Sequence, residues 1–333
     1  MTAENKSMTK DTSAVETPPR RHNADGETRL VGVEIEFANV DVGRTASIVC
    51  DLYGGEQDIK SPHHVSVRDT SLGDFEIELD WQGAHKANTA DEAYRFADVE
   101  GRVREALGHA VTDLVPAEVV CPPIPWDRLG ELRALFDELR EFGAEGTDER
   151  LLYGFGLHLN PEVAEVSTDY AFRNLQAYVI LEEWLRETIN IDVTRRMLPH
   201  INSFPDRYLR LLSCDSYSPD MKTLIHDYTT ENQTRNRGLD MMPLFRHLDE
   251  ATLLASFKDA NLVKARPTFH YRLPNAQLSD ANWDAVVEWN RWVEVEKLAE
   301  DMNRLAVCRE AFAQWLAKPA SERWLDTVKN WFQ

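Results

Sequence analysis

Hydrophobic and polar residues alternate along the segment 29–81, and this alternation predicts β-strands. It is clearest in VGVEIEF, residues 31–37, where every second residue is apolar. Similar stretches recur between turn sequences such as YGGE and SLGD. The predicted strands are RLVGVEIEFANV, TASIVCDLY, HHVSVRD and FEIELDW. We therefore expect this part of the chain to be mostly β-structure.

Helical spacing dominates the remainder of the chain. Apolar residues recur every three to four positions over 91–111, 126–144 and 169–189, a mixed and mostly helical segment covers 192–250, and everything after Asn282 has helical spacing. Short strand-like stretches lie between these helices: PAEVVCPPIP, LLYGFGLHLNPEV and RPTFHYRLPN. Because strands return after helices without strict alternation, we expect an α+β fold with a mainly antiparallel sheet.

The first 27 residues are polar and lack periodicity, which predicts a disordered tail over 1–27. The rest, 28–333, is long enough for one large domain with an ample core, and 43% of the chain is hydrophobic. We predict a single domain that includes a C-terminal helical segment from about residue 280. Its tryptophan-rich helices fit a core or an interface equally well, so an oligomer is possible.

The charge balance excludes some partners. Asp and Glu total 57 against 37 Lys and Arg, giving a net charge of −20, which argues against nucleic acid and anionic membranes. No signal peptide and no apolar stretch of membrane-spanning length is present. The cysteines are scattered, without metal or disulfide spacing, and are expected to be reduced thiols in a cytoplasmic protein. They are Cys50, Cys121, Cys214 and Cys308.

Glu34 and Glu36 share the polar face of the strand 31–37. Like charges on one sheet face repel, so either water screens them or a cation holds them together. Taken alone, this pattern is more often the solvent-exposed face of an antiparallel sheet. The sequence of this strand leaves both interpretations open.

Other predicted strands also carry polar residues on one face. His158 and Asn160 alternate with leucines, and Glu118 begins an apolar segment that ends in prolines. The late strand carries a further set on one face: Arg266, Thr268, His270 and Arg272. The acidic face of FEIELDW is typical of a plain solvent face.

If these faces converge, the chemistry they suit is phosphoryl transfer. Carboxylates bind Mg²⁺, and arginines hold phosphate oxygens through paired hydrogen bonds. No Walker-type phosphate loop is present. Each residue taken separately also has a structural interpretation, as a hydrogen-bonded histidine or an ion-pair partner.

Four stretches, in order along the chain, make the sequence resemble the amidoligase family, carboxylate–amine ligases related to glutamine synthetase and glutamate–cysteine ligase. The similarity covers roughly residues 29 to 300. The stretches are GVEIEF (32–37), AEVVCPP (117–123), GFGLHLNPE (154–162) and ARPTFHYRLPN (265–275). The resemblance implies a curved antiparallel sheet with the active site on its concave face and helices on the other side. It also implies that ATP and Mg²⁺ activate a small-molecule or peptide carboxylate as an acyl phosphate, which an amine converts to an amide.

The resemblance also implies roles for individual residues. Glu36, Arg266 and Arg272 are expected to be catalytic. His158, Asn160 and the two arginines are expected to contact the nucleotide or substrate. The metal ligands are expected to be Glu34, Glu36, Glu118, His158 and His270.

His270 departs from the family pattern, because the late strand of such ligases usually carries a glutamate at this position. A neutral imidazole suits Mn²⁺ better than Mg²⁺. Two interpretations follow: an ATP-dependent ligase that uses Mg²⁺ or Mn²⁺, or a degenerate relative that binds nucleotide or peptide without turnover. Neither the acid nor the amine can be identified from the sequence, and 192–240 shows no motif.

Overall fold

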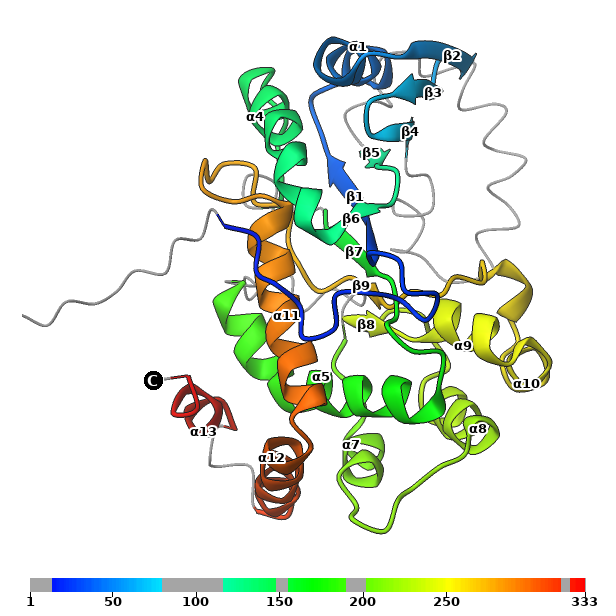
Figure 1. The fold of residues 1–333 in the computed structure, drawn as a ribbon, viewed down its shortest axis with the longest axis vertical. Helices are drawn as coiled ribbons and strands as arrows, with labels where there is room; N and C mark the ends of the chain where they lie inside the picture. Colours follow the sequence, from blue (N-terminus) through cyan, green and yellow to red (C-terminus); the bar gives the residue numbers. More distant parts are fainter. Residues whose placement is uncertain (1–13, 80–115, 148–154, 190–201, 319–323, 333) are drawn as a thin grey trace, which may run out of the picture.

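The computed structural model describes five parts of the chain: residues 14–79, 116–147, 155–189, 202–318 and 324–332. Figure 1 shows a sheet that runs through the molecule with helices packed against it. All pairs between strands in the described residues are antiparallel. The predicted α+β fold with a mainly antiparallel sheet is therefore confirmed.

The strands that carry the predicted polar residues lie side by side in this sheet. The strands are β1 (Leu30–Phe37), β2 (Glu56–Ser61), β3 (His64–Thr70), β4 (Gly73–Leu79), β5 (Ala117–Val120), β6 (Ile124–Pro125), β7 (Leu157–Pro161), β8 (Leu239–Asp240) and β9 (His270–Tyr271). Their order across the sheet is β2-β3-β4-β5-β1-β7-β9-β8, and β6 also pairs with β1. The register places Glu36 of β1 opposite Glu118 of β5, and Glu34 opposite His158 of β7. Residues far apart in sequence thus become neighbours on one face.

Helices occupy most of the remaining described residues. The α-helices are α1 (Val42–Tyr53), α4 (Arg133–Glu141), α5 (Thr168–Thr188), α7 (Asp206–Leu212), α8 (Met221–Glu231), α9 (Met242–Leu248), α10 (Glu250–Ser256), α11 (Ala285–Glu300), α12 (Met302–Leu316) and α13 (Trp324–Lys329). Two 3-10 helices, Trp126–Leu132 and Ala260–Leu262, complete the set. None of the helices in the described part of the chain has the length and apolar character needed to cross a bilayer.

The apolar face of the sheet packs against α5 and α11. Tyr271 of β9 lies with its ring centroid 5.3 Å from Trp292 of α11 and 6.2 Å from Tyr178 of α5. Since neighbouring residues of a strand point to opposite faces, His270 and Arg272 point away from these helices. The helices therefore cover one face, and the polar residues lie on the other.

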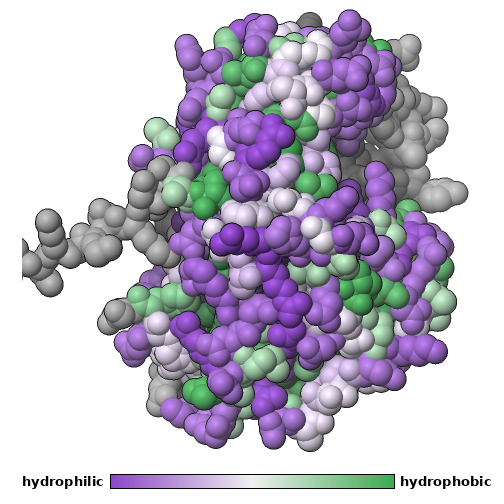
Figure 2. Space-filling model, in the orientation of Figure 1, coloured by the Kyte–Doolittle hydropathy of each residue, from purple (hydrophilic) through white to green (hydrophobic). Residues whose placement is uncertain are grey.

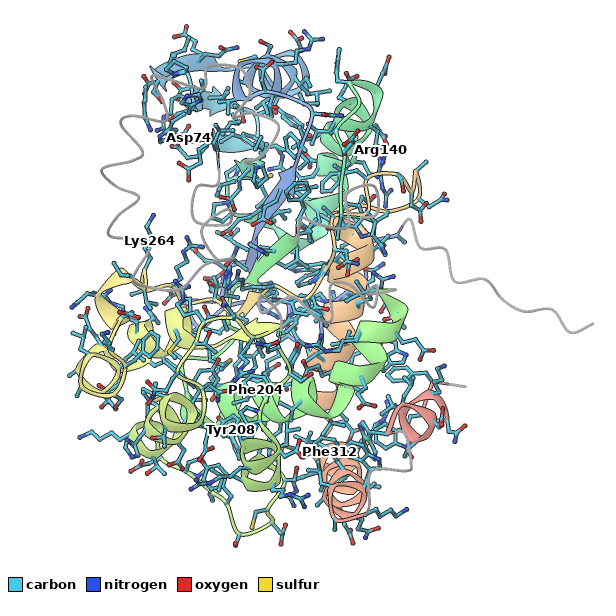
Figure 3. The ribbon with its side chains drawn as sticks, turned by 180° about the vertical axis from the view of Figure 1, so that it is seen from behind. Asp74, Arg140, Phe204, Tyr208, Lys264 and Phe312 are labelled. Atoms are coloured by element: carbon cyan, nitrogen blue, oxygen red, sulfur yellow. The ribbon has the colours of Figure 1, made fainter. Side chains whose placement is uncertain are left out.

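The mostly helical character predicted for 192–250 is confirmed for its described residues. The rings of Phe204 and of Tyr208 in α7, both labelled in Figure 3, have centroids 5.7 Å apart. Tyr228 of α8 packs against both rings and donates a hydrogen bond to the carbonyl oxygen of Leu239 in β8. This aromatic cluster fixes the short edge strand β8 to the helices.

The predicted strand TASIVCDLY is wrong, because residues 42–53 form α1. The side chain of Asp41 caps the helix by accepting from the Arg44 backbone N–H, and Gly54, with φ of 73°, ends it. The buried residues lie three and four apart, as on one face of a helix: Val42, Thr45, Ala46, Ile48 and Val49. The helix arises because capping and packing outweigh the β-preference of the branched side chains.

The N-terminal segment also differs from the expected disordered tail. The described part, residues 14–27, lies along α11, where the Trp289 indole donates to the Glu16 carbonyl oxygen at 2.9 Å. Arg20 forms ion pairs with Glu165 and Glu300 at 2.8 and 2.9 Å. Because these partners are more than a hundred residues away, the polar local sequence did not reveal them.

Some expectations lie outside the described residues. They are residues 1–13 of the predicted tail, the predicted helix 91–111 and the end of the FEIELDW strand. The surface displayed in Figure 2 is mostly hydrophilic, as expected for a chain with a net charge of −20.

Candidate functional site

Adjacent strands bring the predicted polar residues together on one face of the sheet. The register pairs Gly32 with Asn160 and Glu34 with His158 across β1 and β7. A side chain at Gly32 would contact Asn160, whose Cβ lies 3.3 Å from the position of a Cβ there, so glycine leaves room for the amide. The polar faces of these strands therefore converge, as the interpretation of the sequence as a phosphoryl-transfer site required.

Glu34 lies at the centre of a buried hydrogen-bond network. Its side chain is close to Asn160, which donates at 3.0 Å, Arg266, which donates at 3.1 Å, and His158, whose Nδ1 lies at 3.2 Å. Burial alone would raise the pKa of Glu34, but the hydrogen bond from His158 and the charge of Arg266 hold the pKa well below its usual range. Glu34 is thus an ionised carboxylate in a site where it is only 9% exposed.

Glu36 occupies the next position on the same face. Its Oε2 accepts a hydrogen bond from the Gly156 backbone N–H at 2.9 Å, and its Oε1 lies 3.9 Å from His158 Nε2. Glu118 is its direct neighbour on β5. Both glutamates of the opening strand are buried, so the solvent-facing interpretation does not apply to them.

His270 lies in the predicted phase, on the same face as His158. Its Nδ1 is 2.8 Å from Asn160 Oδ1, and the two imidazole centroids are 5.3 Å apart. Burial lowers the pKa of His270 well below its usual value. The carboxylate of Glu34 acts in the opposite direction, whereas the nearby side chains of His158, Arg272 and Arg235 lower the pKa further. His270 is therefore neutral in the folded protein.

Hydrogen bonds determine which imidazole nitrogens remain available. The ionised carboxylate of Glu34 only accepts, so His158 Nδ1 donates to it. Asn160 donates through its amide to Glu34, which leaves its Oδ1 to accept from His270 Nδ1. In this tautomer the Nε2 atoms carry the lone pairs, an arrangement common among metal-binding histidines.

Two groups of side chains meet the distance requirements of a cation site, with ligand atoms within 4.8 Å of one another. They are Glu34, His158 and His270, and Glu36, Glu118 and His158. The second group is richer in carboxylate oxygens, which Mg²⁺ prefers, whereas the first has two imidazoles, which suit Mn²⁺ better. The donor set therefore fits divalent cations.

Arg235 and Asp240 also line this part of the sheet, and sequence reasoning missed them. Asp240 pairs with His270 across β8 and β9, is fully buried, and accepts from Arg235 Nε at 2.9 Å. Arg272, which was predicted, donates to the Arg235 carbonyl oxygen at 3.1 Å. The one available signal was a lone aspartate within the apolar sequence GLDMMP.

The acidic strand β4 lies on the same sheet but has a different environment. Glu76 accepts from Ser66 and His64 and forms ion pairs with Lys60 and Arg68. Its side chain is 32% exposed. This set is the partly solvated face that the sequence suggested, and β4 adds no residue to the two candidate cation groups found in the described residues.

The low pKa of His270 predicts how stability depends on pH. Below the usual value of 6.5 the unfolded chain takes up a proton that folded His270 resists, so stability should fall as pH decreases. In EDTA, the wild type should lose more stability than His270→Gln between about pH 7 and about pH 5, measured by urea unfolding. His226→Gln, at an exposed position, is the control. Equal losses in wild type and His270→Gln would show that His270 is not buried and neutral.

Comparison with known proteins agrees with the geometry of the site. A profile of the family described as "Putative amidoligase enzyme" matches residues 27–294, which include β1, β5, β7, β8 and β9. No curated protein and no solved structure was found to match the chain. The family assignment indicates an enzyme of the ligase type. Since the matched region covers most of the chain, the protein belongs to this amidoligase family.

Proposed function

We propose that the chain is an ATP- and Mg²⁺-dependent carboxylate–amine ligase that forms an amide or peptide-like bond through an acyl phosphate. The observation that carries the proposal is the pair of buried glutamates, Glu34 and Glu36, 9% and 7% exposed, on one sheet face with His158. Buried carboxylates without a matching number of cations are costly unless a metal ion compensates them. The polar face is then the concave, nucleotide-binding face of a glutamine synthetase-like fold.

The residues of the chain have separate roles in this proposal. Glu34, Glu36 and Glu118 hold cations with His158 and His270, and the cations neutralise phosphate charge during transfer. Arg266, whose side chain is 39% exposed and already reaches Glu34, is placed to contact phosphate oxygens. Substrates would be a small-molecule or peptide carboxylate and an amine in the cytoplasm.

ATP binding is expected to require a divalent cation, because the glutamates of the site repel a bare triphosphate. Calorimetry should detect ATP binding with Mg²⁺ or Mn²⁺ and at least about tenfold weaker binding in EDTA. Steady-state ADP release with panels of acids and amines then tests turnover. Equal affinity for ATP in EDTA would contradict the metal-dependent site.

The position of His270 also supports a second candidate function, a relative that binds nucleotide or peptide without turnover. His270 lies within the first candidate cation group, where the family usually has a glutamate. Metal-dependent ATP binding with no ADP release for any acid and amine pair would favour this alternative. Restoration of Mg²⁺-dependent ADP release by His270→Glu would assign the loss to this one position.

A further inference from the structure

Arg272 carries a positive charge that the described residues do not neutralise. Arg272 is 7% exposed, and the only hydrogen bond that its side chain makes within the described residues runs from a terminal nitrogen to the Arg235 carbonyl oxygen at 3.1 Å. Its Nε is buried and has no hydrogen-bond partner. A buried, incompletely bonded guanidinium is costly unless a ligand satisfies it.

Arg235 lies beside Arg272 and is held in place by Asp240. Its Nε donates to Asp240 Oδ2 at 2.9 Å, while Asp240 Oδ1 accepts from the Met242 backbone N–H at 3.0 Å. Asp240 is fully buried, and the Arg235 side chain is 33% exposed. The ion pair uses only Nε, so the two terminal nitrogens of Arg235 have no partner among the described residues.

The charges at this end of the site do not balance. Two guanidinium groups, those of Arg235 and Arg272, lie next to each other, and the carboxylate of Asp240 pairs with Arg235 alone. This local excess of positive charge occurs in a chain whose net charge is −20. Arginine forks of this kind match the oxygens of carboxylates and phosphates.

We propose that Arg235 and Arg272 form an oxyanion-binding site on the β8–β9 side of His270, with Asp240 as the residue that positions Arg235. The site accepts a phosphate or carboxylate group through the free nitrogens of the two arginines. This inference rests on the proposed function for its physiological ligand, which is a phosphate of the nucleotide or a carboxylate of the acid substrate. It adds Arg235 and Asp240, which the sequence motifs do not contain, to the binding residues.

Titration calorimetry with inorganic phosphate in EDTA tests the site without ATP or metal. Wild-type protein should bind phosphate, and Arg235→Gln and Arg272→Gln should each weaken binding by about tenfold or more, the scale of a charge-assisted hydrogen bond. Asp240→Asn should weaken binding by a smaller factor, because it frees Arg235 without removing its charge. The control is Arg207→Gln, at a side chain that is 85% exposed.

Two further results decide the outcome and the source of the anion. If phosphate no longer binds when Mg²⁺ and ATP are bound, the site belongs to a phosphate of the nucleotide. If phosphate still binds under these conditions and acetate competes with it, the site belongs to the carboxylate of the acid substrate. Absence of phosphate binding in the wild type, or unchanged binding in Arg235→Gln with a wild-type melting temperature, overturns the proposal. Because ADP release is not measured, a protein without ligase activity can still pass this test.

Discussion

Glu34→Gln and Glu36→Gln are each expected to reduce ADP release by about 100-fold or more, the scale of a lost electrostatic contribution to catalysis. Each change removes one negative charge from a candidate cation group while keeping the size of the side chain. Glu118→Gln, in the same group as Glu36, should have an effect of similar size. The measurement is the steady-state rate of ADP release at saturating Mg²⁺ and ATP.

The effects of these variants on folding should differ from their effects on rate. A glutamine at position 36 keeps an oxygen that accepts from the Gly156 N–H, so Glu36→Gln should retain its melting temperature. Glu34→Gln should be somewhat less stable, because Arg266 loses its carboxylate partner at 3.1 Å. Asp137→Asn, at a side chain that is 68% exposed, is the matched control for loss of charge. If all three site variants turn over near the wild-type rate, the catalytic site lies elsewhere.

The sequence predicted those parts of the site that lie on regular strands. Side chains two residues apart on a strand point to the same face of the sheet. Alternation alone therefore predicted that Glu34 and Glu36 share one face of their strand, and that His158 and Asn160 share one face of theirs. The same rule placed His270 correctly, although β9 has only two residues. Alternation could not determine which strands pair, and the pairing became an expectation only through the order of the family motifs.

Residues outside that periodicity were missed. Strand β8 has two residues, Leu239 and Asp240, too few to show a period, and Arg235 precedes it in an irregular segment. Their place beside His270 depends on the register between β8 and β9 and on the aromatic contacts of α8. Such tertiary contacts leave no local pattern in the sequence.

The error at α1 has a related cause. TASIVCDLY is rich in β-branched residues, which favour strands when considered alone. The cap at Asp41 and the terminating Gly54 lie at the two ends of the segment, where they indicate a helix. Weighing these end signals above composition would have given the correct element.

Breaking the ion pair between Arg29 and Glu296 should destabilise the fold more than any exposed substitution. The two side chains are 1% and 2% exposed, and Arg29 donates two hydrogen bonds to the carboxylate at 2.6 and 2.8 Å. Trp292 donates to the same carboxylate at 2.8 Å. The pair ties the residue that precedes β1 to α11, so it links the strand of Glu34 and Glu36 to the helices behind it.

Glu296→Gln leaves the Arg29 charge buried without compensation, which should cost about 3–5 kcal/mol of unfolding free energy. Urea unfolding measures this as a lower midpoint relative to wild type. Glu131→Gln is the matched control, since the Arg128–Glu131 pair is 44% and 47% exposed and solvent screens it, so its loss should change the urea midpoint little. The double change Arg29→Met with Glu296→Leu should recover part of the lost stability, because neither charge is then buried. The recovery is partial because the carbonyl oxygens of Arg20 and Glu162 lose their donor and the Trp292 indole N–H loses its acceptor. A Glu296→Gln protein as stable as the Glu131→Gln control would mean that this pair is not buried and does not hold β1 against α11.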